Sequence, residues 1–137
     1  RAIALDVYQT LIPPPMPIDP KKEFPVRKGF RELMERCRER DVKVAITSDM
    51  PLEIVLEDLR DYGINQEQFY MFRRLNQCPK DFSLIIKECE IKPWELFVIG
   101  DCIWKDMEGA ARYGARGFQV PKYDFRDDSF DLNSIVF

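Results

Sequence analysis

Residues Ala2-Ile-Ala-Leu-Asp6-Val-Tyr-Gln-Thr-Leu11 begin with a short apolar run that ends in an aspartate. A run of this length without alternating polar residues is typical of a strand buried on both faces, as in a parallel sheet. Four further short runs of the same kind follow, at residues 42–46, 69–72, 96–99 and 117–120. We therefore expect about five buried, parallel strands.

Helical patterns separate these runs. Apolar residues recur at i, i+3, i+4 and i+7 in residues 30–37, 52–59 and 82–89, and a shorter stripe contains Trp104, Met107 and Ala111. Stripes of this kind turn one apolar helix face toward a sheet. The alternation predicts an α/β fold: a three-layer, doubly wound (Rossmann-like) parallel sheet flanked by helices, in a single domain over residues 1–137.

The composition restricts the chemistry. The chain has 137 residues, a formal net charge of −3 and no histidine, which excludes mechanisms that depend on imidazole. The slight acidity does not indicate a nucleic-acid or membrane surface, and no apolar run approaches the roughly 20 residues that span a bilayer. Four scattered cysteines without a Cys-x-x-Cys pair favour reduced thiols and a cytoplasmic protein. Catalysis would have to use carboxylates, lysine, hydroxyls or a metal.

Polar residues of these types follow the predicted strands. They are Asp6, then Thr47, Ser48 and Asp49, then Lys80, and finally Asp101 and Asp106. A single strand-terminal aspartate is commonly a cap or loop residue, but the carboxyl ends of parallel strands share one edge of the sheet. Carboxylates that meet there require a cation, and an all-oxygen ligand set favours Mg²⁺. A hydroxyl and an ammonium could hold phosphoryl oxygens while one aspartate attacks phosphorus.

In these residues the sequence resembles the haloacid dehalogenase superfamily, most of whose members are Mg²⁺-dependent phosphatases. Asp6-Val-Tyr-Gln-Thr-Leu11 is similar to the first motif of that family, and Ser48 stands at the position of its phosphate-binding hydroxyl. Lys80 resembles the lysine of the third motif, with the usual Lys-Pro order reversed. The stretch from Gly100-Asp101 to Asp106-Met-Glu-Gly-Ala-Ala resembles the fourth motif most specifically.

The resemblance implies a role for each of these residues. Asp6 would attack the phosphoryl group and become an aspartyl-phosphate, with Ser48 and Lys80 as its catalytic partners. Thr47 and Asp49 would join Ser48 and Lys80 in the substrate-binding set. The Mg²⁺ site would comprise Asp6, the backbone carbonyl of Tyr8, Asp101 and Asp106.

Tyr8 departs from the phosphatase pattern. Most phosphatases of the family have an aspartate there, which protonates the leaving group, and such help is typically worth about 10²–10⁴ in rate. A tyrosine in this place is also typical of the dehalogenase branch, although Gln9 replaces the glycine of that pattern. Asp49 could substitute for the missing acid, or it could cap the helix that follows it.

No cap domain fits between the motifs. Only 41 residues separate Asp6 from Ser48, and 31 separate Ser48 from Lys80. Within the family an open site accompanies a macromolecular phosphorylated substrate, or a cover supplied by a protein partner or a second copy. The proline-rich residues 13–25 are either a wall over the site or a plain connector.

Three functional classes follow from these observations. The first is a capless phosphohydrolase that uses Asp6 and Mg²⁺. The second is a catalytically weak or silent relative that keeps the fold to bind a partner. The third is a phosphate-accepting receiver domain, whose motif order differs from the one seen here.

Overall fold

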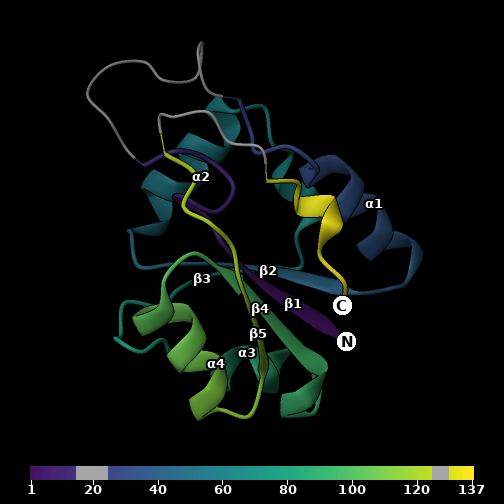
Figure 1. Cartoon of the computed structure of the whole chain (residues 1–137), viewed down its shortest axis with the longest axis vertical. Helices are drawn as coiled ribbons and strands as arrows, with labels where there is room; N and C mark the ends of the chain where they lie inside the picture. The colour runs from purple at the N-terminus through teal and green to yellow at the C-terminus, as the bar shows by residue number, and fades with distance from the viewer. Residues whose placement is uncertain (15–24, 125–129) are drawn as a thin grey trace.

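The computed structural model describes residues 1–14, 25–124 and 130–137. Its centre is a five-stranded sheet in the order β3-β2-β1-β4-β5, and every neighbouring pair is parallel (Figure 1). The strands are β1 (Ala2–Asp6), β2 (Lys43–Ser48), β3 (Met71–Arg74), β4 (Leu96–Gly100) and β5 (Arg116–Gln119). The chain builds one half of the sheet outward from β1 and then crosses to β4, which confirms the predicted doubly wound topology.

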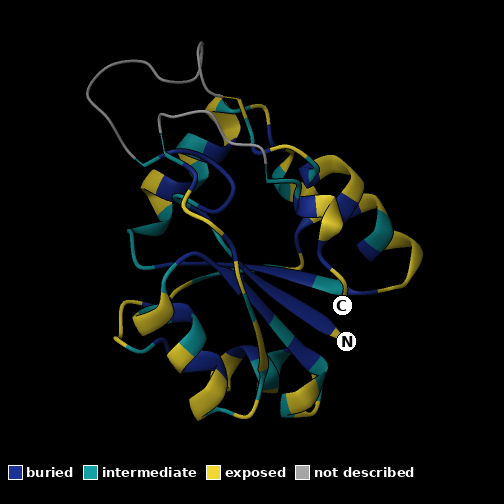
Figure 2. Cartoon of the chain, viewed as in Figure 1, coloured by how far each residue is buried: buried dark blue, intermediate teal, exposed yellow. Residues whose placement is uncertain are grey.

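Helices cover both faces of the sheet and complete three layers (Figure 1). They are α1 (Phe30–Glu39) and α2 (Leu52–Asp61) on one face, and α3 (Ser83–Glu88) and α4 (Glu108–Arg112) on the other. The predicted stripes at residues 30–37 and 52–59 lie in α1 and α2, whose exposed sides face outward (Figure 2). Within the described residues, no cap domain interrupts the alternation of strands and helices.

Side chains of β1 alternate between the two faces. Ile3, Leu5 and Val7 belong to the core beneath α1, whereas Ala2 and Ala4 belong to the core that contains residues of α3 and α4. Because successive strand residues point to opposite faces, the side chain of Asp6 lies on the same face as Ala2 and Ala4. This alternation determines which groups can reach Asp6.

Two predictions about burial were wrong. The runs at residues 69–72 and 117–120 overlap the edge strands β3 and β5, which are partly exposed because each has a single neighbouring strand, although Phe69 and Val120 are buried. Trp104, expected on a sheet-facing stripe, is 69% exposed. It lies in a π-helical turn, Ile103–Met107, in which Asp106 points inward; a residue two positions away faces the opposite side.

The chain ends in a short element. A 3-10 turn at Leu132–Ser134 packs against α1, with Leu132 and Ile135 buried. Most of the proline-rich region falls on residues 15–24, outside the described residues, so both of its expected roles, a wall over the site or a plain connector, stay predictions. No helix in the described ranges has the length and apolar character that a bilayer crossing needs.

Candidate active site

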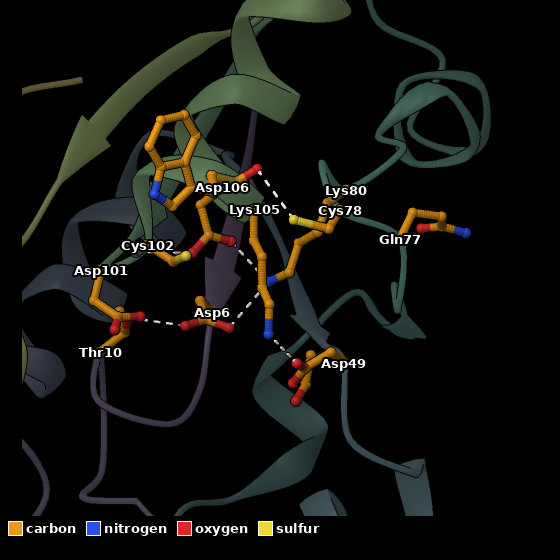
Figure 3. A network of polar contacts seen from close by, with 12 residues as sticks. Asp6, Thr10, Asp49, Gln77, Cys78, Lys80, Asp101, Cys102, Lys105 and Asp106 are labelled. Atoms are coloured by element: carbon orange, nitrogen blue, oxygen red, sulfur yellow. Dashed lines mark hydrogen bonds and ion pairs between the residues drawn. The ribbon is translucent and has the colours of Figure 1, made fainter.

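Three aspartates meet at the carboxyl edge of the sheet. Asp6 ends β1, Asp101 directly follows β4, and Asp106 projects from the π-helical turn (Figure 3). One carboxylate oxygen from each lies within 4.8 Å of the others. Asp101 and Asp106 are buried, and Asp6 is half-buried. The strand order explains this meeting, because β1 and β4 are neighbours and their ends share one edge.

Two glycines allow the fourth motif to fold tightly. A Cβ atom on Gly100 would lie 2.3 Å from Oδ2 of Asp106, so only glycine leaves room for that carboxylate. A Cβ atom on Gly109 would lie 2.5 Å from the carbonyl oxygen of Lys80. The turn also directs Oδ2 of Asp106 toward the backbone N–H of Cys102, at 3.3 Å. These close approaches hold Asp106 and the backbone of Lys80 beside the strand ends.

Lys80 bridges two of the carboxylates. Its Nζ lies 3.0 Å from Oδ1 of Asp6 and 2.7 Å from Oδ1 of Asp106, and its side chain is 2% exposed (Figure 3). Its backbone N–H donates to the carbonyl of Lys105 at 3.0 Å. Burial alone would lower the pKa of Lys80, but the two carboxylates raise it well above its usual value. The lysine is therefore a fixed cation.

Thr10 joins the same cluster, although its position in the first motif gave no role from sequence alone. Its hydroxyl lies 3.1 Å from Oδ2 of Asp6 and 3.2 Å from Oδ1 of Asp101, and the residue is fully buried. The sequence feature that could have indicated this role is the position of Thr10, four residues after Asp6.

Even with Lys80 beside them, the three carboxylates repel one another when no metal ion is bound. Burial, followed by the hydrogen bond and charge of Asp6, raises the pKa of Asp101 to about 7. Burial and the charge of Asp6 raise the pKa of Asp106 to about 6, although Lys80 opposes this. A hard divalent cation that accepts oxygen ligands would relieve the repulsion, so the residues present fit Mg²⁺.

The two hydroxyls at the end of β2 point in opposite directions. Thr47 is in register with Asp6, so their side chains lie on the same face of the sheet. The Thr47 hydroxyl is buried and has no hydrogen-bond partner among the described residues. Ser48 faces the other way, and its Oγ accepts the backbone N–H of Met50 at 3.2 Å. The register thus places Thr47 on the face of Asp6, the Ser48 hydroxyl is engaged by the N–H of Met50, and neither residue is among those that line the cavity beside Asp6.

Tyr8 does not offer its hydroxyl to the cluster. The hydroxyl donates to Oδ2 of Asp58 at 2.5 Å, in α2. Burial and this carboxylate raise the pKa of Tyr8 far above its usual range. The Tyr8 hydroxyl is therefore a poor proton donor to anything bound at Asp6.

Asp49 pairs with Lys105 across the mouth of the site (Figure 3). Burial tends to raise the pKa of Asp49, but the Lys105 ammonium outweighs this and lowers it. The expectation that Asp49 caps α2 was wrong. The residue before the helix is Pro51, and no side chain in the described part of the chain caps the helix; the Asp49 carboxylate is paired with Lys105 instead. No sequence signal had pointed to Lys105.

A cavity of about 250 Å³ opens beside the carboxylates. Asp6, Lys80, Asp101 and Asp106 form its floor, and its other lining residues include Gln9, Pro14, Asp49, Lys105 and Lys122. The cavity gives a small anionic group access to Asp6, with Lys80 at its base and two further lysines around it.

Comparisons with known proteins agree with this arrangement. A family model described as haloacid dehalogenase-like hydrolase matches residues 17–114. The matched span begins after Asp6 and includes Thr47, Lys80, Asp101 and Asp106. A search of curated protein sequences gives no match.

Several solved structures share the fold. A proposed beta-phosphoglucomutase from Thermotoga maritima has a TM-score of 0.74 at 15% identity, over 93% of this chain and 88% of that one. CbbY from Rhodobacter sphaeroides, in complex with phosphate, has a TM-score of 0.73 at 16% identity, over 94% and 89%. A hydrolase of this superfamily from Ehrlichia chaffeensis has a TM-score of 0.68 at 18% identity, over 86% of each chain. At these identities the likeness establishes the fold.

Proposed function

The chain belongs to the haloacid dehalogenase-like hydrolase family, and we propose that it is a Mg²⁺-dependent phosphohydrolase acting through an aspartyl-phosphate on Asp6. The observation that carries this proposal is the Asp6 carboxylate, open to a cavity and held by the ammonium of Lys80 at 3.0 Å. A nucleophilic carboxylate beside a fixed cation is the arrangement that phosphoryl transfer to an aspartate needs.

The metal would be held by Asp6, Asp101 and Asp106, with the backbone carbonyl of Tyr8 as a further oxygen ligand. Their convergence within 4.8 Å and the raised pKa values of Asp101 and Asp106 support this assignment. Bound Mg²⁺ supplies positive charge that polarises the phosphoryl oxygens.

The residues of the chain would then act in two steps. A carboxylate oxygen of Asp6 attacks phosphorus, and the bond from phosphorus to the leaving oxygen breaks. Water then cleaves the acyl phosphate and releases inorganic phosphate. Throughout, Lys80 balances the negative charge on the phosphoryl oxygens, and its contact with Asp106 keeps the ammonium in place.

The hydroxyl of Thr47 is a second candidate, beside Ser48, for binding a phosphoryl oxygen. It is buried, unpartnered among the described residues and on the same face as Asp6, so a phosphoryl oxygen would supply its missing hydrogen-bond partner. The Ser48 hydroxyl, engaged by the N–H of Met50, shapes the loop.

The leaving group receives little help from Tyr8 or Asp49. The tyrosine hydroxyl is bonded to Asp58, and the Asp49 carboxylate is held by Lys105. We therefore expect phosphate esters or acyl phosphates whose leaving group is a weak base to react fastest.

The lack of help from Tyr8 and Asp49 also favours the second candidate function, a catalytically weak relative that binds a partner. The proposal also includes what covers the open site, either a macromolecular phosphorylated substrate or a second copy of the chain. It places the protein in the cytoplasm.

The test is hydrolysis of p-nitrophenyl phosphate with and without Mg²⁺. Turnover that requires Mg²⁺ and is lost in Asp6→Asn supports the phosphohydrolase. A protein that binds Mg²⁺ but shows no turnover above Asp6→Asn supports the silent relative instead.

A further inference from the structure

The loop that carries Thr10 has an unfavourable backbone. Gln9 has a φ of 63°, in the left-handed region that residues other than glycine seldom adopt. Such a conformation persists only where the surrounding structure enforces it. Within the loop, the Thr10 and Leu11 amides donate to the carbonyl of Val7 at 3.2 and 2.8 Å. The position of the Thr10 hydroxyl therefore depends on what holds residues 7–12.

Arg27 is a buried group that contacts this loop and is not among the residues that line the cavity. It is 1% exposed, and its guanidinium donates to the carbonyl of Thr10 at 3.4 Å. Its backbone N–H donates to the carbonyl of Leu11 at 2.8 Å. The guanidinium also lies over two aromatic rings, 5.5 Å from the centroid of Tyr123 and 5.0 Å from that of Phe130. Cation–π contacts of this kind strengthen when they are desolvated.

Tyr123 binds the same loop directly. Its backbone N–H donates to the carbonyl of Gln9 at 2.8 Å, and its hydroxyl donates to the carbonyl of Pro25 at 2.6 Å. The segment after β5 thus contacts both the strained residue and the segment that precedes α1. We call Arg27, Tyr123 and Phe130 the Arg27 brace.

We propose that Arg27 is a positioning residue that acts through Thr10. The brace fixes the carbonyl of Thr10, and thereby keeps its hydroxyl between the carboxylates of Asp6 and Asp101, at 3.1 and 3.2 Å. The hydroxyl would in turn fix the orientation of both carboxylates, which are ligands of the proposed metal site. The effect on metal binding therefore rests on the proposed function, whereas the brace itself does not. Groups that orient metal ligands typically change metal affinity about 10- to 100-fold when removed.

The experiment compares Arg27→Met with Arg36→Met. Arg36 is a matched control, because its guanidinium also lies over an aromatic ring of the C-terminal segment, Phe137, at 4.8 Å. It donates to a backbone carbonyl as well, that of Ile135 at 2.7 Å, but it contacts no residue of the loop or the cluster in the structure described. Arg27→Lys retains a donor and a charge, and provides a second variant should Arg27→Met fail to fold.

Two readouts separate the brace from the proposed function. The first is hydrogen exchange at the amides of Thr10 and Leu11. We expect exchange to rise about tenfold or more in Arg27→Met, less in Arg27→Lys, and not in Arg36→Met. The second is Mg²⁺ binding measured by calorimetry, where Arg27→Met should raise the dissociation constant about tenfold and Arg36→Met should leave it unchanged.

Unchanged hydrogen exchange at the Thr10 and Leu11 amides in both Arg27 variants would show that Arg27 does not hold the loop. Faster exchange with unchanged Mg²⁺ affinity would show that the brace holds the loop without positioning the carboxylates, and would overturn the positioning role. A wild-type protein that neither binds Mg²⁺ nor hydrolyses p-nitrophenyl phosphate would remove the proposed function, and hydrogen exchange would still decide on the brace.

Discussion

Replacing Asp101 with asparagine should stabilise the protein without a divalent cation and destabilise it, relative to wild type, with one. The side chain is 7% exposed, and burial together with the neighbouring Asp6 raises its pKa from 3.8 to about 7. Asparagine keeps the shape and can still accept from the hydroxyl of Thr10, but it carries no charge. The substitution therefore removes the repulsion and also removes a ligand of the proposed metal site.

The magnitude follows from the pKa shift. A rise from 3.8 to about 7 corresponds to at most about 4 kcal/mol of destabilisation at neutral pH. Water at the mouth of the cavity screens this charge, so we expect roughly 1–2 kcal/mol. The size of this destabilisation depends on pH, because the folded state holds the Asp101 proton more tightly than the unfolded state. Near pH 4 the effect is absent; it grows as pH rises through the interval up to about 7, and it is complete above that.

The assay is urea unfolding of wild type and Asp101→Asn at pH 4.5 and 7.5, with EDTA and again with excess Mg²⁺. Without Mg²⁺, the difference in the free energy of unfolding should favour the variant more at pH 7.5 than at pH 4.5. With Mg²⁺ at about 100 times the dissociation constant, wild type should gain about 2.7 kcal/mol and the order should reverse. A wild type that is more stable than the variant at pH 7.5 in EDTA would refute the account of the cluster.

Three further predictions concern the loop and the cavity. Thr47→Val should lower kcat/KM for p-nitrophenyl phosphate about 10- to 100-fold. It should not lower the stability in urea, because the hydroxyl that it removes is buried and has no partner among the described residues. Ser48→Ala should have little effect on kcat/KM. Equal losses in the two variants would contradict the assignment. Gln9→Gly should raise the free energy of unfolding, measured by thermal unfolding, by about 0.5–1 kcal/mol. The reason is that the relief of left-handed backbone strain at residue 9 exceeds the entropy cost of glycine. A lower free energy of unfolding in the variant would argue against strain. Across a series of substituted phenyl phosphates, kcat/KM should rise steeply as the pKa of the leaving group falls, and Tyr8→Asp should flatten this dependence; a flat response in wild type would point to an acid elsewhere.

The meeting of Asp6, Asp101 and Asp106 could be predicted because it depends on local patterns and one topological rule. Asp6 ends one apolar run, Asp101 directly follows another, and Asp106 lies one turn beyond Asp101. Parallel strands bring the ends of such runs to one edge of the sheet. Lys80 was identified differently, from its place at the start of a helical stripe and its resemblance to the lysine of the third motif.

Other features depend on information that periodicity lacks. The choice between Thr47 and Ser48 needs the register of β2 against β1, since a shift of one residue exchanges the two faces. The exposure of Trp104 follows from a π-helical turn, for which a stripe drawn with ordinary helical spacing gives the wrong face. Arg27 and Tyr123 reach the loop through contacts between segments far apart in the sequence, and no local pattern marks them.

The most direct test of the central claim is to look for phosphate on Asp6. Protein mixed with p-nitrophenyl phosphate and Mg²⁺, quenched in acid and analysed by mass spectrometry, should carry one phosphoryl group on the peptide that contains Asp6. The adduct should be absent in EDTA and in Asp6→Asn. Release of p-nitrophenol without such an adduct, or an adduct that persists in Asp6→Asn, would contradict the account.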